Sequence, residues 1–231
     1  MMSLSQSSLP DGSSFDRWWQ LQGEWVEAPN QRRGGASGVQ RVSVEQGLWY
    51  AKRQTGHLYR SPRHPFGRPT VLRERDALLA LGRLGVRVPH LVYCGAAHCP
   101  QEGWRGLLVT EALKGFEDID SFYANGARER YDQALQQRLL QAIGTTLARM
   151  HQGRWQHGCL YAKHVFVRVV GVEVEVALLD LEKSRRRFNR RRLVRHDLRQ
   201  LRRHSPWSEQ EWQQLLQGYR QQYGRSLPEL G

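Results

Sequence analysis

Cysteine is scarce in this chain, and long apolar runs are absent. Cys94, Cys99 and Cys159 are the only cysteines among 231 residues. Their odd number and the lack of paired spacings argue against a disulfide framework and against a zinc site. No window approaches the roughly 18 apolar residues of a membrane span, and the polar N-terminus has no apolar signal core. These absences favour a reducing cytoplasm, with neither secretion nor a membrane-spanning helix.

Positive charge, in contrast, is abundant. The formal net charge of +13 at pH 7 predicts an acidic partner, which could be nucleic acid, a phosphorylated substrate or an anionic membrane surface. At 231 residues the chain can bury a sizeable core, as one large domain or as two small lobes.

The stretch HGCLYAKHVFV at 157–167 lies between a predicted helix and a predicted hairpin. Apolar residues recur at steps of three and four over 135–150, which indicates a helix of about five turns. Residues 165–170 and 172–179 are rich in valine and flank Gly171, which predicts two strands joined by a tight turn that end at Asp180. We therefore expect the stretch to be a loop that is held at both ends.

The N-terminal part opens with a serine-rich segment, residues 1–14, that is predicted to be a disordered leader. In FDRWWQLQGEW, which follows, most of the apolar residues could share one helical face. We expect them to pack on a first lobe, and an interfacial membrane contact is the alternative.

A glycine cluster then precedes two predicted strands. Gly34, Gly35 and Gly38 would let the backbone approach a phosphate closely, although a simple turn also explains such a cluster. Residues 39–44 and 48–52 have the pattern of strands, and the second ends at Lys52. A strand pair that presents a lysine makes this cluster a candidate phosphate-covering loop.

The helix predicted from Thr70 onwards carries Glu74 in its first turns. This acid could pair with Lys52, and a solvated helix charge is the simpler alternative. Two more predicted strands follow, VPHLVYCG and WRGLLVTEAL, and the second of them runs into Glu111.

Five motifs occur in the chain in this order: GASGVQ, PFGRPT, LLVTE, HGCLYAKH and LDLEKSRRR. On these motifs the chain, from roughly Trp18 to Tyr219, resembles the lipopolysaccharide-kinase family, which includes the heptose and Kdo kinases, and within it the InaA group. The resemblance implies an α+β fold that is bilobal and protein-kinase-like. It places a small β-rich N-lobe at 15–113 and a larger, mainly helical C-lobe at 114–231.

The resemblance also implies ATP and Mg²⁺ as cofactors and assigns roles to residues. Lys52 would contact the phosphates with Glu74 orienting it, and the strand that ends at Glu111 would be the hinge that binds adenine. Asp180 would bind magnesium, and His164 would take the second metal-side position, which is usually an asparagine. The predicted catalytic residues are His157, Cys159 and Asp180.

Cys159 departs from the kinase pattern, which has an aspartate that accepts or orients the substrate hydroxyl proton. A thiol is a poor substitute unless basic neighbours favour the thiolate. Glu182 could supply a carboxylate instead, or positioning and magnesium alone could carry a slow transfer. Two functions therefore stay open: an ATP-dependent phosphotransferase, and a pseudokinase-type nucleotide-binding stress sensor with impaired catalysis.

The densest basic run follows Asp180, where a kinase keeps the segment that meets its substrate. Arginine binds phosphate in a bidentate way, so a phosphorylated sugar or an anionic glycolipid at the inner membrane fits, whereas a solvated surface is the alternative. Nucleic acid ranks last because no reading module is recognised. The predicted substrate-binding residues are Arg185, Arg186, Arg187, Arg190, Arg191 and Arg192.

Two further features are expected to be structural. Asp197 is predicted to accept hydrogen bonds from the catalytic-loop backbone or to pair with an arginine. A final helix is predicted to start at Ser208, with a capping box to Glu211, and to stop at Gly224.

Overall fold

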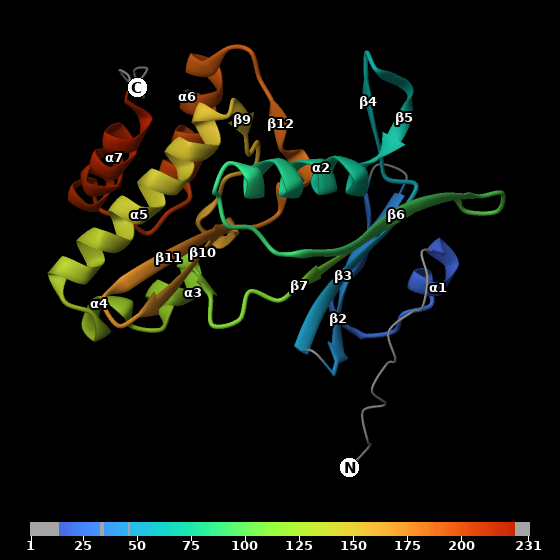
Figure 1. Cartoon of the computed structure of the whole chain (residues 1–231), viewed down its shortest axis with the longest axis horizontal. Coiled ribbons are helices and arrows are strands. Elements are labelled where there is room, and N and C mark those ends of the chain that lie inside the picture. Colours follow the sequence, from blue (N-terminus) through green and yellow to red (C-terminus); the bar gives the residue numbers. More distant parts are fainter. Residues whose placement is uncertain (1–13, 33–34, 46, 225–231) are drawn as a thin grey trace. The chain divides into compact units, whose positions relative to one another are not determined.

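The computed structural model describes residues 14–32, 35–45 and 47–224. The described chain divides into two compact units, which we treat one at a time (Figure 1). The N-terminal unit comprises the described part of Met1–Asp76 together with Pro89–Leu113. The C-terminal unit comprises Ala77–Val88 and the described part of Lys114–Gly231. The predicted leader falls almost entirely outside the described residues.

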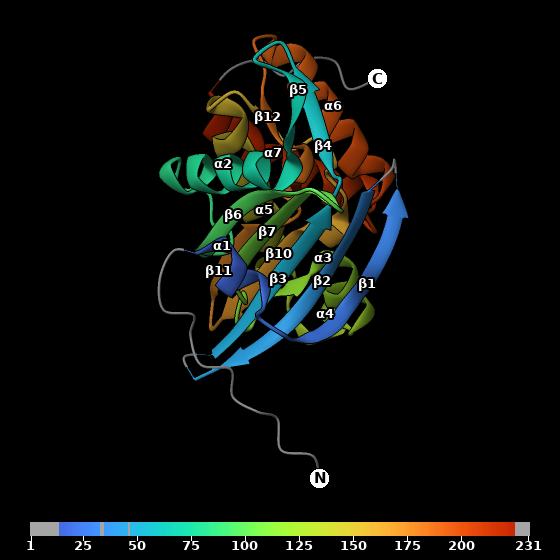
Figure 2. The same cartoon turned by 90° about the vertical axis from the view of Figure 1, so that its right-hand side faces the viewer.

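The N-terminal unit is built on an antiparallel sheet of five strands, which lie side by side in Figure 2. Their order across the sheet differs from their order in the chain, because β7 lies between β3 and β6. The strands predicted around residues 39–44 and 48–52 are confirmed as β2 and β3. The strands in sheet order are β1 (Glu24–Arg32), β2 (Gly35–Val44), β3 (Gly47–Thr55), β7 (Gly103–Glu111) and β6 (Leu91–Cys99).

One face of this sheet buries an apolar cluster against helix α1 (Phe15–Trp19). Trp18 stacks on Tyr93 at a centroid distance of 4.5 Å and also contacts Trp49. Burial of such rings dominates the stability of a small lobe. The expected packing of these aromatics on the first lobe is therefore confirmed for Trp18.

The expectation of one longer helical face in FDRWWQLQGEW is wrong. The helix ends at Trp19, and Trp25 lies in strand β1, where it pairs with Gln40 of β2. The backbone hydrogen bonds of the sheet edge prevail here over the apolar spacing, because cross-strand partners determine a strand more than local pattern does.

A short hairpin leads from the sheet to the first long helix. Thr70 is the first residue of that helix, and its hydroxyl donates to Gln54 Oε1 at 2.6 Å inside the N-terminal unit. The helix predicted over this segment is confirmed. The elements are β4 (Leu58–Ser61), β5 (His64–Pro69) and α2 (Thr70–Arg83).

The C-terminal unit is mainly helical. The apolar stripe predicted over 135–150 is the buried face of α5, which packs on α7 (Figure 1). The predicted start of the last helix is confirmed, because Ser208 and Glu211 form a capping box. The helices are α3 (Ile119–Ala124), α4 (Ala127–Arg130), α5 (Gln133–Gln152), α6 (Arg190–Arg203) and α7 (Glu209–Tyr223).

The segment between α5 and α6 contains short strands and two turns of 3₁₀-helix. The predicted hairpin is confirmed as β10 and β11. No helix in the described part of the chain is both long and apolar enough to cross a membrane. The remaining elements are β8 (Glu117–Asp118), β9 (Trp155–Gln156), η1 (Ala162–His164), β10 (Val165–Val170), β11 (Glu173–Leu178), η2 (Leu181–Lys183) and β12 (Arg185–Arg186).

Candidate active site

The loop at 157–164 and the end of strand β11 lie against each other. The β10–β11 ladder pairs Val165 with Leu178, and one step further the Leu179 amide donates to the His164 carbonyl at 2.9 Å. Asp180 follows directly. The antiparallel register therefore brings His164 and Asp180 to one place, although a whole hairpin separates them in the chain.

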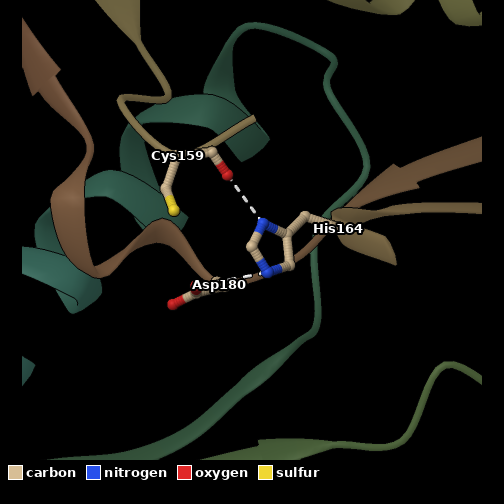
Figure 3. Close-up of side chains that lie close together, drawn as sticks. All are labelled: Cys159, His164 and Asp180. Carbon is tan, nitrogen blue, oxygen red and sulfur yellow. Dashed lines mark hydrogen bonds and ion pairs between the residues drawn. The ribbon is translucent and has the colours of Figure 1, made fainter. Parts of the chain in front are cut away.

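Asp180 has a backbone conformation that is uncommon for a residue with a side chain. Its φ of +54° and ψ of +59° lie in the left-handed region. Residues held in such conformations cluster at functional sites, because the surrounding structure must stabilise them. Here the carboxylate faces His164, whose Nε2 lies 3.4 Å from Asp180 Oδ2 (Figure 3).

The second ring nitrogen of His164 faces back to the loop. Nδ1 lies 2.6 Å from the carbonyl oxygen of Cys159. A carbonyl only accepts hydrogen bonds, so Nδ1 carries a proton, and Nε2 is the ring nitrogen that could bind a metal. This contact orients the ring in the way that a metal-binding histidine is oriented by its outer partner.

Cys159 completes the cluster from inside the loop. Its side chain is buried, and its Sγ, a His164 ring nitrogen and an Asp180 carboxylate oxygen all lie within 4.8 Å of one another (Figure 3). Lys183 Nζ lies 3.7 Å from the sulfur. Lys183 therefore places its ammonium group beside the buried sulfur.

This set of side chains fits a divalent cation, but it fits magnesium only in part. Mg²⁺ takes oxygen ligands and keeps several waters, so the Asp180 carboxylate suits it. Imidazole nitrogen and thiolate sulfur suit softer metals such as zinc. His164 and Asp180 could thus hold a divalent cation, whereas Cys159 adds nothing to a magnesium site.

His157 begins the loop and is completely buried. Its Nε2 donates to the Leu179 carbonyl at 2.9 Å, and the Ser184 hydroxyl donates to the His157 carbonyl at 3.2 Å. Burial lowers the pKa of His157, which keeps its ring neutral. The ring therefore ties the loop to the end of β11, which is a positioning role.

Two side chains of α6 hold the backbone of the loop. Asp197 accepts the amide protons of His157 at 2.6 Å and of Gly158 at 3.0 Å. One turn further along the helix, Gln200 Oε1 accepts the Leu160 amide at 2.8 Å. The predicted hydrogen bonds between Asp197 and the catalytic-loop backbone are confirmed.

Asp197 is fully buried, yet it is ionised. Burial by itself raises the pKa of this carboxyl, but the interactions that lower it, led by hydrogen bonds from His151 at 3.2 Å and His196 at 3.0 Å, together outweigh burial. The net result is a pKa well below the ordinary value. Tyr219 of α7 lies 2.7 Å from the other ring nitrogen of His151, so the carboxylate links α5, α6, α7 and the loop.

Lys52 and Glu74 lie together inside the N-terminal unit, on β3 and α2. Lys52 Nζ is 2.8 Å from Glu74 Oε2, and the two side chains are only 17% and 9% exposed. At this exposure solvent screens the pair less than it screens a surface ion pair. The ion pair predicted from the sequence is confirmed.

The predicted glycine loop is described only in part. Gly34 lies outside the described residues, and Gly35 and Gly38 belong to β2. A Cβ on Gly38 would lie 2.7 Å from the Trp25 ring and 2.9 Å from the Glu27 carbonyl oxygen. Close contact with β1 therefore requires this glycine even without a nucleotide.

Glu111 ends strand β7. Its amide donates to the His90 carbonyl at 2.9 Å, and the Ala112 amide donates to the Leu48 carbonyl at 2.8 Å. These two amides already hold the segment to its own sheet. An adenine edge bound here would use other backbone groups of the segment.

The first three predicted substrate-binding arginines are exposed and belong to β12 or follow it. Strand β12 pairs with β9, and the Arg187 guanidinium donates to Gln156 Oε1 at 2.8 Å. The backbone of residues 185–186 is therefore held in place by its pairing with β9.

The other three, Arg190, Arg191 and Arg192, form the first turn of α6. Asn189 caps this turn by accepting the Arg192 amide at 2.9 Å, and the turn contains no acidic residue. Positive side chains at a helix N-terminus oppose the helix dipole, which favours anions there. An anion bound at the N-terminus of α6 would therefore stabilise this cluster of positive side chains.

Sequence patterns missed four residues that shape this site: His151, Lys183, Ser184 and Gln200. His151 directly follows the apolar stripe predicted over 135–150, and Gln200 lies one turn after Asp197 on the same helix face. That spacing is a usable signal. Lys183 and Ser184 gave no signal, because only the folded loop brings them to Cys159 and His157.

The chain is similar to proteins of known sequence and structure. The sequence model of the "Lipopolysaccharide kinase (Kdo/WaaP) family" matches residues 16–219. Protein InaA from Escherichia coli (strain K12) is 43% identical over 206 residues, which cover 89% of this chain and 94% of that protein.

Among solved structures, WaaP in complex with acyl carrier protein superimposes with a TM-score of 0.69. The alignment covers 90% of this chain and 82% of that chain at 20% identity. At this identity the match establishes the fold alone. The predicted bilobal, kinase-like fold is confirmed.

We predict that Asp197→Asn lowers the free energy of unfolding by roughly 3 kcal/mol at neutral pH, the usual loss when one partner of a buried charged network is removed. Because the folded-state pKa of Asp197 is depressed, its stabilising contribution is present above the unfolded value of about 3.9. That contribution is lost as pH falls through the folded pKa, so the difference between parent and variant shrinks below about pH 4. Urea denaturation from pH 7 to pH 3 measures it.

The matched control is Asp120→Asn on the exposed side of α3. Burial and nearby Asp118 raise the pKa of Asp120, so removing its charge does not remove a stabilising contribution. Equal losses for the two variants, or a difference that does not change with pH, would contradict the role of Asp197.

Proposed function

Because the chain belongs to the lipopolysaccharide kinase (Kdo/WaaP) family, we propose that it transfers the γ-phosphoryl group of ATP to a hydroxyl of a lipopolysaccharide-core sugar or a related anionic glycolipid. Kinase-like chemistry is the property of the family as a whole. The observation that supports it most strongly in this chain is His164 Nε2 at 3.4 Å from Asp180 Oδ2, on a loop whose amides are held by Asp197.

In this proposal the N-terminal unit supplies the phosphate contact. Lys52 binds the nucleotide phosphates, and Glu74 holds its ammonium group in place through the 2.8 Å ion pair. The glycines of the β1–β2 hairpin cover the phosphates, and the segment at Glu111 binds the adenine edge through its backbone. These are the roles that such residues have in kinase-like folds.

The C-terminal unit supplies the remaining charges. A divalent cation, Mg²⁺ in this proposal, held by Asp180 and His164 would neutralise charge on the β- and γ-phosphate oxygens. His157 and Asp197 keep the loop in position, so the acceptor hydroxyl meets groups that are already oriented.

The acceptor binds along the basic segment. Arg185 to Arg187 and the first turn of α6 present guanidinium groups, which bind phosphate in a bidentate way. An acceptor that carries phosphate or carboxylate groups also relieves the unfavourable charge at the α6 N-terminus. With a glycolipid acceptor, the protein would bind peripherally to the cytoplasmic face of the inner membrane, where ATP is available.

A second candidate function is a pseudokinase-type nucleotide-binding stress sensor. The observation that favours it is the buried thiol of Cys159, which stands where kinases have the carboxylate that accepts the hydroxyl proton. Without that carboxylate, transfer must rely on positioning and charge, or on Glu182 as a substitute. Slow transfer is therefore expected of the parent protein.

The direct test is ATP turnover with magnesium, with and without purified lipopolysaccharide core. We expect core-dependent phosphoryl transfer, and we expect Mg-ATP to stabilise the fold by about 2.7 kcal/mol at a hundred times its dissociation constant. Lys52→Ala and Asp180→Ala lose both effects, whereas Glu173→Ala, an exposed acid at the start of β11, keeps them. An unchanged melting temperature of the parent at millimolar Mg-ATP would disprove nucleotide binding.

A second prediction concerns Cys159 and separates the two candidates. If the missing proton acceptor is the only defect, Cys159→Asp raises the transfer rate by up to about 10²- to 10⁴-fold, the usual contribution of a general base. In a pseudokinase the new carboxylate would be buried without a partner and would lower the melting temperature instead. ATP binding without transfer by either protein would favour the sensor.

A third prediction concerns the helix that carries the basic segment. Arg191→Glu replaces an unfavourable cation in the first turn of α6 with an acid, so the melting temperature rises while the acceptor KM increases by roughly tenfold or more. The matched control is Arg203→Glu in the last turn of α6, where a cation suits the dipole. That variant should lower the melting temperature and leave the KM unchanged.

A further inference from the structure

Cys159, His164 and Asp180 together form a site whose donors suit a softer metal than the proposed reaction uses. We infer that these three side chains bind Zn²⁺, and that bound Zn²⁺ inhibits the protein by occupying the position of the cation that accompanies ATP. The inhibitory part of this inference rests on the proposed phosphotransferase function, whereas Zn²⁺ binding stands on the three side chains alone.

The geometry of the three donors is close to that of a three-ligand zinc site. Bonds of about 2.3 Å to sulfur and about 2.0–2.2 Å to nitrogen and oxygen place tetrahedral ligands roughly 3.3–3.7 Å apart. His164 Nε2 and Asp180 Oδ2 already lie 3.4 Å apart, and the three donor atoms lie within 4.8 Å of one another (Figure 3). A small rotation of the Cys159 or Asp180 side chain would bring the remaining donor-to-donor distances into the tetrahedral range.

The surroundings prepare each donor for a metal. The Cys159 carbonyl accepts the Nδ1 proton of His164, so Nε2, which lies 3.4 Å from Asp180 Oδ2, is the ring nitrogen that a metal would use. The Cys159 side chain is buried, and the Lys183 ammonium lies 3.7 Å from its sulfur. Asp180 has a left-handed backbone, and one of its carboxylate oxygens lies within 4.8 Å of both the sulfur and the His164 ring nitrogen.

Access and open coordination are also present. The Asp180 side chain is 41% exposed, whereas that of His164 is 11% exposed, so an ion can enter past the carboxylate. Three protein ligands leave a fourth position for water or for a phosphate oxygen, as in catalytic zinc sites. The site is therefore an exchangeable one rather than a closed structural one.

Cys159 decides which metal is held in the absence of nucleotide. Thiolate and imidazole ligands favour Zn²⁺, whereas magnesium binds mainly through carboxylates and phosphate oxygens. In a kinase with an aspartate at this position the site would contain no sulfur and would lose this preference. Zn²⁺ and the nucleotide-bound cation both need His164 and Asp180, so they compete.

The binding test uses the full chain, without nucleotide, in a competition for Zn²⁺ with a chromophoric chelator. We expect one strong Zn²⁺ site per chain. Cys159→Ser should weaken it at least 10- to 100-fold, because even an outer partner of a ligand has an effect of that size. Cys99→Ser, at the half-buried end of β6, is the matched thiol control and keeps full affinity.

Cobalt provides a readout that a merely structural effect of the variant cannot imitate. Co²⁺ bound to the parent should show the near-ultraviolet charge-transfer absorption of a thiolate ligand. His164→Gln weakens Co²⁺ binding, and Cys159→Ser removes the absorption while circular dichroism stays unchanged. Zn²⁺ affinity equal in parent and Cys159→Ser, or a Co²⁺ spectrum without the thiolate band, would overturn the inference.

The inhibition test distinguishes this inference from the proposed function. Zn²⁺ should suppress Mg-ATP turnover in the parent, and Cys159→Ser should require at least tenfold more Zn²⁺ for the same suppression. If no turnover exists in any variant but the thiolate-dependent site is present, the proposed function fails and the Zn²⁺ site stands. Turnover that is equally sensitive to Zn²⁺ in both proteins would sink the inhibitory role.

Discussion

The site depends on one buried carboxylate. Asp197 accepts the amides of His157 and Gly158 and is kept ionised by hydrogen bonds from His151 and His196. A buried charge is tolerated only when all its oxygens are paired, so loss of one partner disturbs every element that meets there. The loop conformation, and with it the position of Cys159, follows from this network.

A second constraint is the register of the β10–β11 hairpin. Because the ladder continues past Val165 and Leu178 to the bond between Leu179 and His164, Asp180 is placed beside the His164 ring. A slip of one residue would turn every side chain of a strand to the opposite face and separate the two donors. The register of the valine-rich strands thus determines the distance between the His164 ring and the Asp180 carboxylate.

Cys159 bears both on the rate of phosphoryl transfer and on the choice of metal. The same substitution that removes the usual proton acceptor of a kinase adds a sulfur beside a histidine and an aspartate. Weak transfer and a preference for a thiophilic metal would then have one cause.

Sequence patterns alone determined the long helix before the loop, the hairpin after it and the capping box at Ser208. Such features depend on periodicity and on side chains within one or two elements, which a sequence displays directly. The short α1 helix and the zinc-like donor set were decided only by tertiary structure. Cross-strand hydrogen bonds drew Trp25 into β1, and the hairpin register brought Asp180 from a distant segment to Cys159, which no local spacing can indicate.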